Sequence, residues 1–219
     1  MHKVAINIII FLILFICLGT SYSDFKIGTR QIHLDFHTSE KLVDIGKNFS
    51  KKQFQEALIA GNVNAINIFG KGHHSWSYYP TKVGKIHPNL DFDLLGAQIE
   101  ACHEIGVLAP IYYTFGWSHI DAIEHPEWRA RQENGKYINS SSPYNLRAKA
   151  SESKPSFQWF NMCVNTSYHD HIMEQIEEMC QLYPIDGFWF DIYQVANPCY
   201  GKPCNCLLYT SDAADETCR

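Results

Sequence analysis

The sequence lacks the excess of basic residues that nucleic-acid-binding proteins need. It has 18 lysines and arginines against 23 acidic residues, which gives a formal net charge of −5. Because a protein that binds a phosphate backbone needs a cationic face, this balance argues against nucleic acid as a partner. The sequence also lacks a glycine-rich phosphate loop after its first expected strand, which disfavours a dinucleotide-binding fold. Beyond the N-terminus it has no apolar run long enough to cross a bilayer, so stable membrane insertion is not expected.

The N-terminus has the layout of a secretory signal peptide. Lys3 precedes an apolar run over residues 4–18, and small polar residues follow up to Ser23. The run is shorter than the ~20 residues of a transmembrane helix. A cleaved signal over residues 1–23 is therefore favoured over an uncleaved membrane anchor. We expect a secreted or extracytoplasmic protein.

Eight cysteines are present, and one of them, Cys17, lies in the expected signal. In an oxidising compartment the others would form disulfides, whose pairing cannot be deduced from spacing. Cys199, Cys204 and Cys206 form a local cluster. This cluster has no second CxxC pair beside it, so disulfides are favoured over a zinc site.

Strand-like and helix-like segments alternate along the rest of the chain. The strand candidates are strongly apolar and cover residues 31–36, 63–69, 107–115 and 187–193, with a further strand-like run at 157–164. The helix candidates cover residues 49–60, 92–105 and 168–182, with partial helix over 120–131 and a loop over 135–155. Ser50 is the expected N-cap of the first helix, and Gly61 and Gly106 are expected to end the first two. This alternation predicts a parallel sheet covered by helices.

Two architectures fit the alternation, a doubly wound sheet and a TIM barrel. Polar and aromatic residues recur just after the expected strands, where a TIM barrel builds its active site. These residues are His37, His73, His74, Trp117, Asn165 and Asp191. We therefore predict an α/β fold, the N-terminal part of a (β/α)8 TIM barrel over residues 24–205. The barrel is expected to be incomplete, because a full one needs eight strands and about 250 residues.

The end of the chain does not continue this pattern. From Cys206 to Glu216 the sequence CLLYTSDAADE has no periodicity. It resembles an in-frame translation of a transposase adapter used in sequencing libraries. We expect residues 206–219 to be an assembly artefact and exclude them from the fold inference.

Asp191 is the leading candidate for chemistry. It ends an apolar strand, where an ionised carboxylate must be hydrogen-bonded, metal-bound or open to a pocket. Glycoside hydrolysis needs two carboxyl groups, and Asp191 fits the nucleophile. The candidates for binding sugar hydroxyls or stacking on sugar faces are His37, His73, His74, Trp76, Trp117 and Asn165.

Four segments carry a resemblance to known families. They are RQIHLDFHTSE, KGHHSWSYYPTKVGKIHPNLDFDLLGAQIEACHEIGV, HPEWRAR and DGFWFDIY. Together they look like the hypothetical glycosyl hydrolase 6 family and, more distantly, the α-L-fucosidases of glycoside hydrolase family 29. Those fucosidases carry a His-His pair after the second barrel strand and a nucleophilic Asp after the fourth, in a Trp-Phe-Asp context. The resemblance implies that His73 and His74 bind the sugar, that His37 or His33 contacts it, and that Asp191 is the nucleophile.

The sequence departs from the fucosidase pattern at two points. Ser75-Trp76 stands where fucosidases have Asp-Gly, and Ile192 stands where they have Gly after the nucleophile. The sugar specificity therefore stays open. The family's acid/base residue comes later in the barrel than this chain reaches, so none is assigned.

The resemblance implies a retaining exo-glycosidase of α-L-fucosidase type that acts on an oligosaccharide or glycoconjugate and needs no metal or cofactor. One alternative is a carbohydrate-binding protein without catalysis. The other is a metal-dependent hydrolase on the same barrel. Its ligands would be His33, Asp35, His37, His73, His74 and Asp191, the first three of which alternate along one expected strand and so would share a face.

Overall fold

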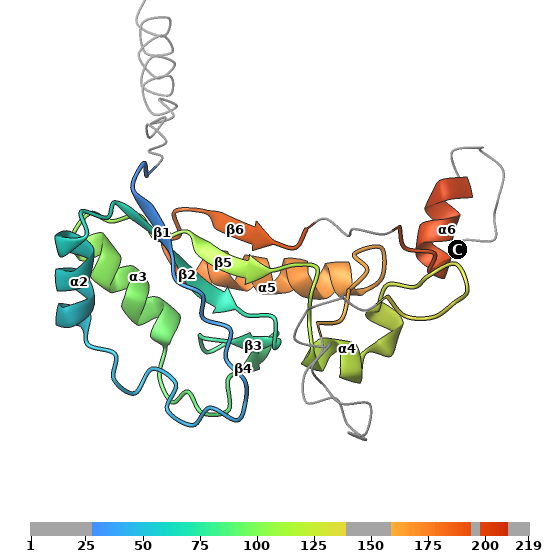
Figure 1. Ribbon diagram of the computed structural model, residues 1–219, viewed down its shortest axis with the longest axis horizontal. Coiled ribbons are helices and arrows are strands. Elements are labelled where there is room, and N and C mark those ends of the chain that lie inside the picture. The colour runs from blue at the N-terminus through green and yellow to red at the C-terminus, as the bar shows by residue number, and fades with distance from the viewer. Residues whose placement is uncertain (1–27, 139–158, 194–197, 210–219) are drawn as a thin grey trace, which may run out of the picture.

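The computed structural model describes residues 28–138, 159–193 and 198–209. Within them, four strands run parallel in the order in which they occur along the chain (Figure 1). These strands are β1 (Gln31–His33), β2 (Ala65–Lys71), β5 (Ile111–Thr114) and β6 (Phe188–Asp191). A short antiparallel partner of β2, β3 (Trp76–Ser77), carries β4 (Lys85–Ile86) on its other side. The predicted α/β fold with a mostly parallel sheet is confirmed.

The strand register aligns the carboxyl ends of the sheet. Thr114 on β5 pairs with Asp191 on β6, and Lys71 on β2 pairs with Tyr113. The register shifts at Gly70, where a Cβ would lie 2.8 Å from atoms of Ile111 and Met179. The loop that follows β2 therefore begins at the same edge of the sheet as the end of β6.

The first two helices begin at polar capping residues. Ser50 caps α2 (Lys51–Ala60) by accepting a hydrogen bond from the backbone N–H of Gln53. Asp93 caps α3 (Leu94–Glu104) in the same way through Gly96. After α3, Gly106 has the expected left-handed backbone, with φ +70°. After α2, Asn62 adopts that conformation with φ 51°, and Gly61 stays right-handed. The prediction that Gly61 ends the helix is confirmed.

The described residues form three more α-helices and a 3-10 turn. α5 (Tyr168–Leu182) has the bounds that the sequence predicts. The partly helical segment divides into α4 (Ile120–Glu124) and a 3-10 turn, η1 (Pro126–Trp128), because proline cannot donate the backbone hydrogen bond that would continue α4. α6 (Lys202–Tyr209) crosses the predicted junction at residue 205.

Two faces of the sheet bury different side chains. On one face, Ile66, Ile68, Ile111 and Tyr113 pack with residues of α2, α3 and α5 in a large apolar core. The opposite face carries a smaller cluster. Its buried members are Ile45, Phe69, Tyr78, Leu90, Leu94 and Tyr112. In the barrel interpretation, the first face is the outside and the second is the lumen.

Two strand predictions were wrong in extent. β1 ends at His33, so the alternation expected to continue through Asp35 and His37 does not exist. The run at 157–164 forms no regular strand in its described part. It makes isolated antiparallel bridges, Asn161 with Trp117 and Met162 with Arg129.

Several predicted segments lie partly or wholly outside the described residues. They are the signal peptide at 1–23, most of the loop at 135–155 and the end of the tail at 210–219. None of the described helices combines the length and the hydropathy that a bilayer-spanning segment requires.

Candidate active site

Asp191 lies at the carboxyl end of β6, and donors hold both of its carboxylate oxygens. Tyr112 Oη donates to Oδ2 at 2.5 Å, and the backbone N–H of Ile192 donates to Oδ1 at 2.9 Å. The side chain of Asp191 remains 35% exposed. A carboxylate that is fixed at both oxygens yet open to one side can meet a ligand without first reorienting.

Ile192, which follows the carboxylate, has an uncommon backbone conformation. Its φ is 55°, in the left-handed region that disfavours β-branched residues. The N–H of Ile192 donates to the side chain of the residue before it. A glycine, which the fucosidase pattern has here, adopts such a backbone without steric cost.

Two histidines lie beside Asp191. The rings of His37 and His73 stack with centroids 3.8 Å apart and an interplanar angle of 15°. Nε2 of His73 is 3.7 Å from Oδ2 of Asp191, and Nε2 of His37 is 3.3 Å from Tyr112 Oη. Burial, with a smaller contribution from His37, lowers the pKa of His73 to about 2. Burial also lowers the pKa of His37 to about 4, although Asp35 and Asp191 raise it. Both rings are therefore neutral at physiological pH.

The hydrogen bonds define which ring nitrogen carries the proton. His37 Nδ1 accepts the backbone N–H of His73 at 2.9 Å, so its proton is on Nε2, toward Tyr112. Thr114 Oγ1 donates to the carbonyl of Trp117 at 3.0 Å, and it is 2.6 Å from His73 Nδ1. Because the Thr114 hydroxyl has one proton, His73 must donate from Nδ1. Its Nε2 is then an acceptor that faces Asp191.

An aromatic wall flanks the two histidines. Trp117 and Trp159 meet edge to face, with ring centroids 4.6 Å apart. The ring of His73 lies 5.1 Å from Trp117 and 4.2 Å from Trp159. Trp117 Nε1 donates to Asn161 Oδ1 at 2.6 Å, which holds its ring in this orientation. The two tryptophans place apolar rings beside the histidines.

His74, on the loop after β2, and Trp76, which begins β3, form a second group. Burial lowers the pKa of His74 to about 4, with His119 lowering it and Glu40 raising it. Burial alone would raise the pKa of Glu40, but hydrogen bonds from its own backbone and from Ser39 hold it below its usual value. His74 and Trp76 thus lie near the carboxylate of Glu40, which the sequence analysis did not identify.

Three further candidates from the sequence make other contacts than those predicted. The described hydrogen bond of Asn165 is to Cys204 Sγ, at 3.2 Å, and not to the residues around Asp191. The Asp35 side chain is 72% exposed and pairs with His37 Nε2 at 3.4 Å. His33 packs on Tyr112, with centroids 5.3 Å apart, and it is His37 rather than His33 that stacks on His73.

A buried ion pair lies next to the loop that carries His73. The positions of its two residues in the sequence did not indicate that they would meet. Lys71 Nζ and Asp121 Oδ2 are 2.7 Å apart, with side chains 1% and 6% exposed. Ser118 Oγ also donates to Asp121 at 2.7 Å, and Ser75 Oγ accepts the backbone N–H of Asp121. Burial raises the pKa of Asp121, but the charge of Lys71 and the hydrogen bonds from Lys71 and Ser118 together outweigh it and keep the pKa below its usual value. The pair ties the end of β2 to the start of α4.

Three residues at the site were not predicted from the sequence. Tyr112, Thr114 and Trp159 make contacts with the candidate histidines or with Asp191. A signal existed for the first two, since alternation along Ile-Tyr-Tyr-Thr separates Tyr112 and Thr114 from Tyr113. Alternation separates the two faces of the strand but does not tell which of them faces the lumen, because that depends on how the strand pairs with its neighbours.

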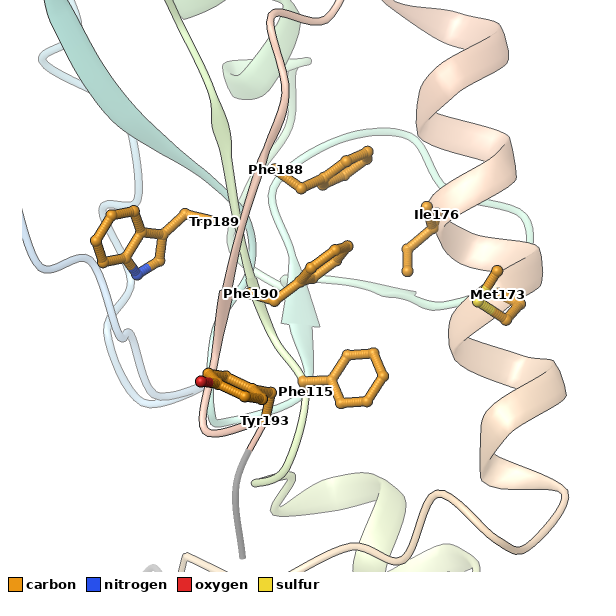
Figure 2. A pocket seen from close by; sticks show the side chains of 7 residues that line it. All are labelled: Phe115, Met173, Ile176, Phe188, Trp189, Phe190 and Tyr193. Carbon is orange, nitrogen blue, oxygen red and sulfur yellow. The ribbon is translucent and has the colours of Figure 1, made fainter. Parts of the chain in front are cut away.

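An apolar groove lies on the other side of β6 (Figure 2). It has a volume of about 780 Å³ between β6 and α5. Phe188 and Phe190 point into it toward Met173 and Ile176, whereas Trp189 points to the opposite side of the strand. The groove contains no carboxylate or histidine among its lining residues, so it is not where the chemistry lies.

The histidines do not form a metal site in the described residues. The group there whose ligand atoms are close enough to hold an ion is formed by Cys163, Cys199 and Cys204. The alternative of a metal-dependent hydrolase with histidine and aspartate ligands therefore gains no support from the geometry.

A parallel sheet that brings a fixed carboxylate, neutral histidines and tryptophans to its carboxyl edge has the arrangement of a glycoside-hydrolase-like domain. The family model of hypothetical glycosyl hydrolase 6 matches residues 50–192. The chain belongs to that family, as its motifs predict.

Solved structures relate this domain to α-L-fucosidases. The alpha-L-fucosidase isoenzyme 2 from Paenibacillus thiaminolyticus is similar with 45% identity and a TM-score of 0.70, over 86% of this chain and 27% of that one. This chain thus spans little more than a quarter of that fucosidase.

More distant structures share less with the chain. A hypothetical protein from Ruminiclostridium thermocellum has 12% identity and a TM-score of 0.50, over 68% of this chain and 73% of that one. A Thermotoga maritima alpha-fucosidase in complex with fucose has 18% identity and a TM-score of 0.48, over 78% and 35%. No curated protein matches the chain.

Proposed function

We propose that the chain carries the nucleophile of a retaining exo-glycosidase of the α-L-fucosidase type. One observation carries the proposal. Asp191 ends the fourth parallel strand with both carboxylate oxygens held and 35% of its side chain exposed. The similarity to the Paenibacillus thiaminolyticus enzyme, at 45% identity, supports the sugar class.

In the retaining mechanism, a carboxylate oxygen of Asp191 bonds to the anomeric carbon as the bond to the leaving oxygen breaks. Water then hydrolyses this glycosyl-enzyme. Tyr112 and the backbone of Ile192 orient the carboxylate before the sugar arrives. A second carboxyl group, a role that we assign to none of the described residues, protonates the leaving oxygen as general acid.

The neighbouring residues suit a terminal sugar of an oligosaccharide or glycoconjugate. His73 Nε2 and Asp191 Oδ2 are two acceptors 3.7 Å apart, and a sugar hydroxyl can donate to either. Trp117 and Trp159 offer apolar faces beside them. We assign the hydroxyl contacts to His37, His73 and His74, and the stacking to the tryptophans.

The test replaces Asp191 in the full-length parent protein. Asp191→Ala should lower kcat on an aryl α-L-fucoside by ~10³-fold or more. Added azide should restore turnover and yield a glycosyl azide, because the small anion fits where the carboxylate was. Asp170→Ala, which removes an exposed carboxylate on α5, is the matched control.

Two outcomes would contradict the proposal. Turnover that survives Asp191→Ala removes this residue from the mechanism. Binding of fucosylated glycans without any turnover by the unsubstituted parent protein would instead identify a carbohydrate-binding protein.

We also propose that residues 1–23 direct secretion. The layout of Lys3 followed by an apolar run supports this. Sequencing the N-terminus of the protein recovered from the culture medium should give a start near Ser23. A cell-associated protein that keeps its first residues would contradict it and indicate a membrane anchor.

A further inference from the structure

Three cysteine thiols converge away from the Asp191 group. The sulfurs of Cys163, Cys199 and Cys204 all lie within 4.8 Å of one another. Cys163 Sγ and Cys204 Sγ are 3.2 Å apart, although 41 residues separate them in the sequence. Cys163 and Cys204 are buried, at 4% and 8% exposure. The fold thus gathers three soft ligand atoms in a shielded place.

Several N–H groups donate to these sulfurs. The backbone N–H groups of Arg131 and Gly201 are each 3.4 Å from Cys199 Sγ. The side-chain amide of Asn165 donates to Cys204 Sγ at 3.2 Å. Such donors favour the thiolate over the thiol, and they are the outer contacts that orient thiolate ligands around a metal.

We propose that Cys163, Cys199 and Cys204 form a structural site for a thiophilic divalent cation, with zinc as the expected ion. Tetrahedral zinc with Zn–S bonds of about 2.3 Å holds its sulfurs roughly 3.8 Å apart, a spacing that the three thiols meet with small shifts. Water completes the fourth position. A disulfide would use two of the three sulfurs and would not explain why the third lies beside them, whereas a metal ion binds all three.

The proposed ion would join three segments that flank the aromatic wall. Cys163 N–H donates to Trp128 O at 2.7 Å, and Tyr200 N–H donates to Arg131 O at 2.8 Å. The segment that ends at Cys163 also carries Trp159, whose ring contacts His73. α6 lies at the same end of the molecule as α4 (Figure 1). The site therefore fastens the chain after β6 to the segment that bears the wall.

Sequence spacing favoured disulfides here because Cys199 and Cys204 have no CxxC pair nearby. The third ligand, Cys163, precedes α5 in the sequence, whereas Cys199 and Cys204 follow it. Only the fold reveals that Cys163 belongs with the other two.

The test measures metal in the full-length parent protein, purified with a thiol reductant and dialysed. Elemental analysis should find about one zinc per chain. Cys163→Ser and Cys204→Ser should each lose most of it. Cys180→Ser, which removes an exposed thiol on α5, is the matched control and should keep the zinc.

A second measurement needs no variant. Titrating thiols in the folded parent protein before and after a strong chelator should expose three additional reactive cysteines. Cobalt exchanged into the protein should give the thiolate charge-transfer absorption of a tetrahedral site. Peptide mapping of the unreduced protein that finds Cys163 in a disulfide, with no zinc, would overturn the proposal. So would zinc that the cysteine variants retain and His37→Ala loses.

Discussion

Tyr112 Oη donates a hydrogen bond to Oδ2 of Asp191 at 2.5 Å, across the neighbouring parallel strands β5 and β6. Burial raises the pKa of Tyr112, and the charge of Asp191 raises it further. The phenol therefore stays protonated and acts as a fixed donor. A second donor, the N–H of Ile192, holds the other carboxylate oxygen.

Removing the phenol oxygen should impair turnover more than folding. In the full-length parent protein, Tyr112→Phe should lower kcat by about 10–100-fold with little change in KM, because the carboxylate loses an orienting donor. Tyr113→Phe is the matched control on the same strand, since its hydroxyl bonds to Gln175 on the outer face. Steady-state kinetics checks this. Equal effects of the two substitutions would contradict a positioning role for Tyr112.

Gly116→Ala should disturb Asp191 from a distance. A Cβ at Gly116 would overlap the carbonyl oxygen of Ile192, the residue whose N–H holds Asp191 Oδ1. We expect a loss of about 1–3 kcal/mol in the free energy of unfolding, as for overpacking, together with a fall in kcat. Gly61→Ala is the control, because its Cβ would have 3.3 Å to its nearest neighbours. Urea denaturation and kinetics give both values. Unchanged stability and turnover would show that the turn can shift freely.

The buried pair of Lys71 and Asp121 should be costly to break. Lys71→Met leaves a buried carboxylate unpaired and should lower the free energy of unfolding by about 3–5 kcal/mol. Adding Asp121→Asn should recover part of this loss. Because pairing keeps the pKa of Asp121 below its unfolded value, the stabilisation is present above the unfolded pKa and disappears as pH falls through the folded pKa. Urea denaturation at several pH values checks this, and a loss below ~1 kcal/mol at neutral pH would refute it.

Stability should also fall on acidification because of the buried histidines. Burial lowers the pKa of His37 to about 4 and that of His73 to about 2, from 6.5. Below pH 6.5 the unfolded chain binds protons that the folded chain does not. The free energy of unfolding should then decrease by about 1.4 kcal/mol per pH unit for each histidine between pH 6.5 and 4.

A histidine variant separates this effect from general acid denaturation. His73→Gln should flatten the pH dependence, measured by chemical denaturation. His169→Gln, which changes an exposed histidine on α5, should leave it as it is. An identical pH dependence in all three proteins would contradict the role of the buried rings.

The helices and the parallel order of the strands could be predicted because their signals are local. Ser50 caps α2 as expected, and the bounds of α5 agree with its apolar periodicity. The end of β1 could not be predicted, since the apolar run continues past His33 after the pairing with β2 stops. A strand ends where its pairing with the neighbouring strand ends, and the residue pattern within one segment does not show that point.

The sequence by itself determined the α/β class, the family and the carboxylate that ends an apolar strand. These follow from periodicity and motifs, in which neighbouring residues act together. Only the tertiary structure decided that Tyr112 and His73 lie at Asp191, that Lys71 pairs with Asp121, and that Cys163 meets Cys199 and Cys204. Such contacts join residues far apart in the chain. The register of the strands and the packing of the loops bring them together, because buried polar groups must find partners.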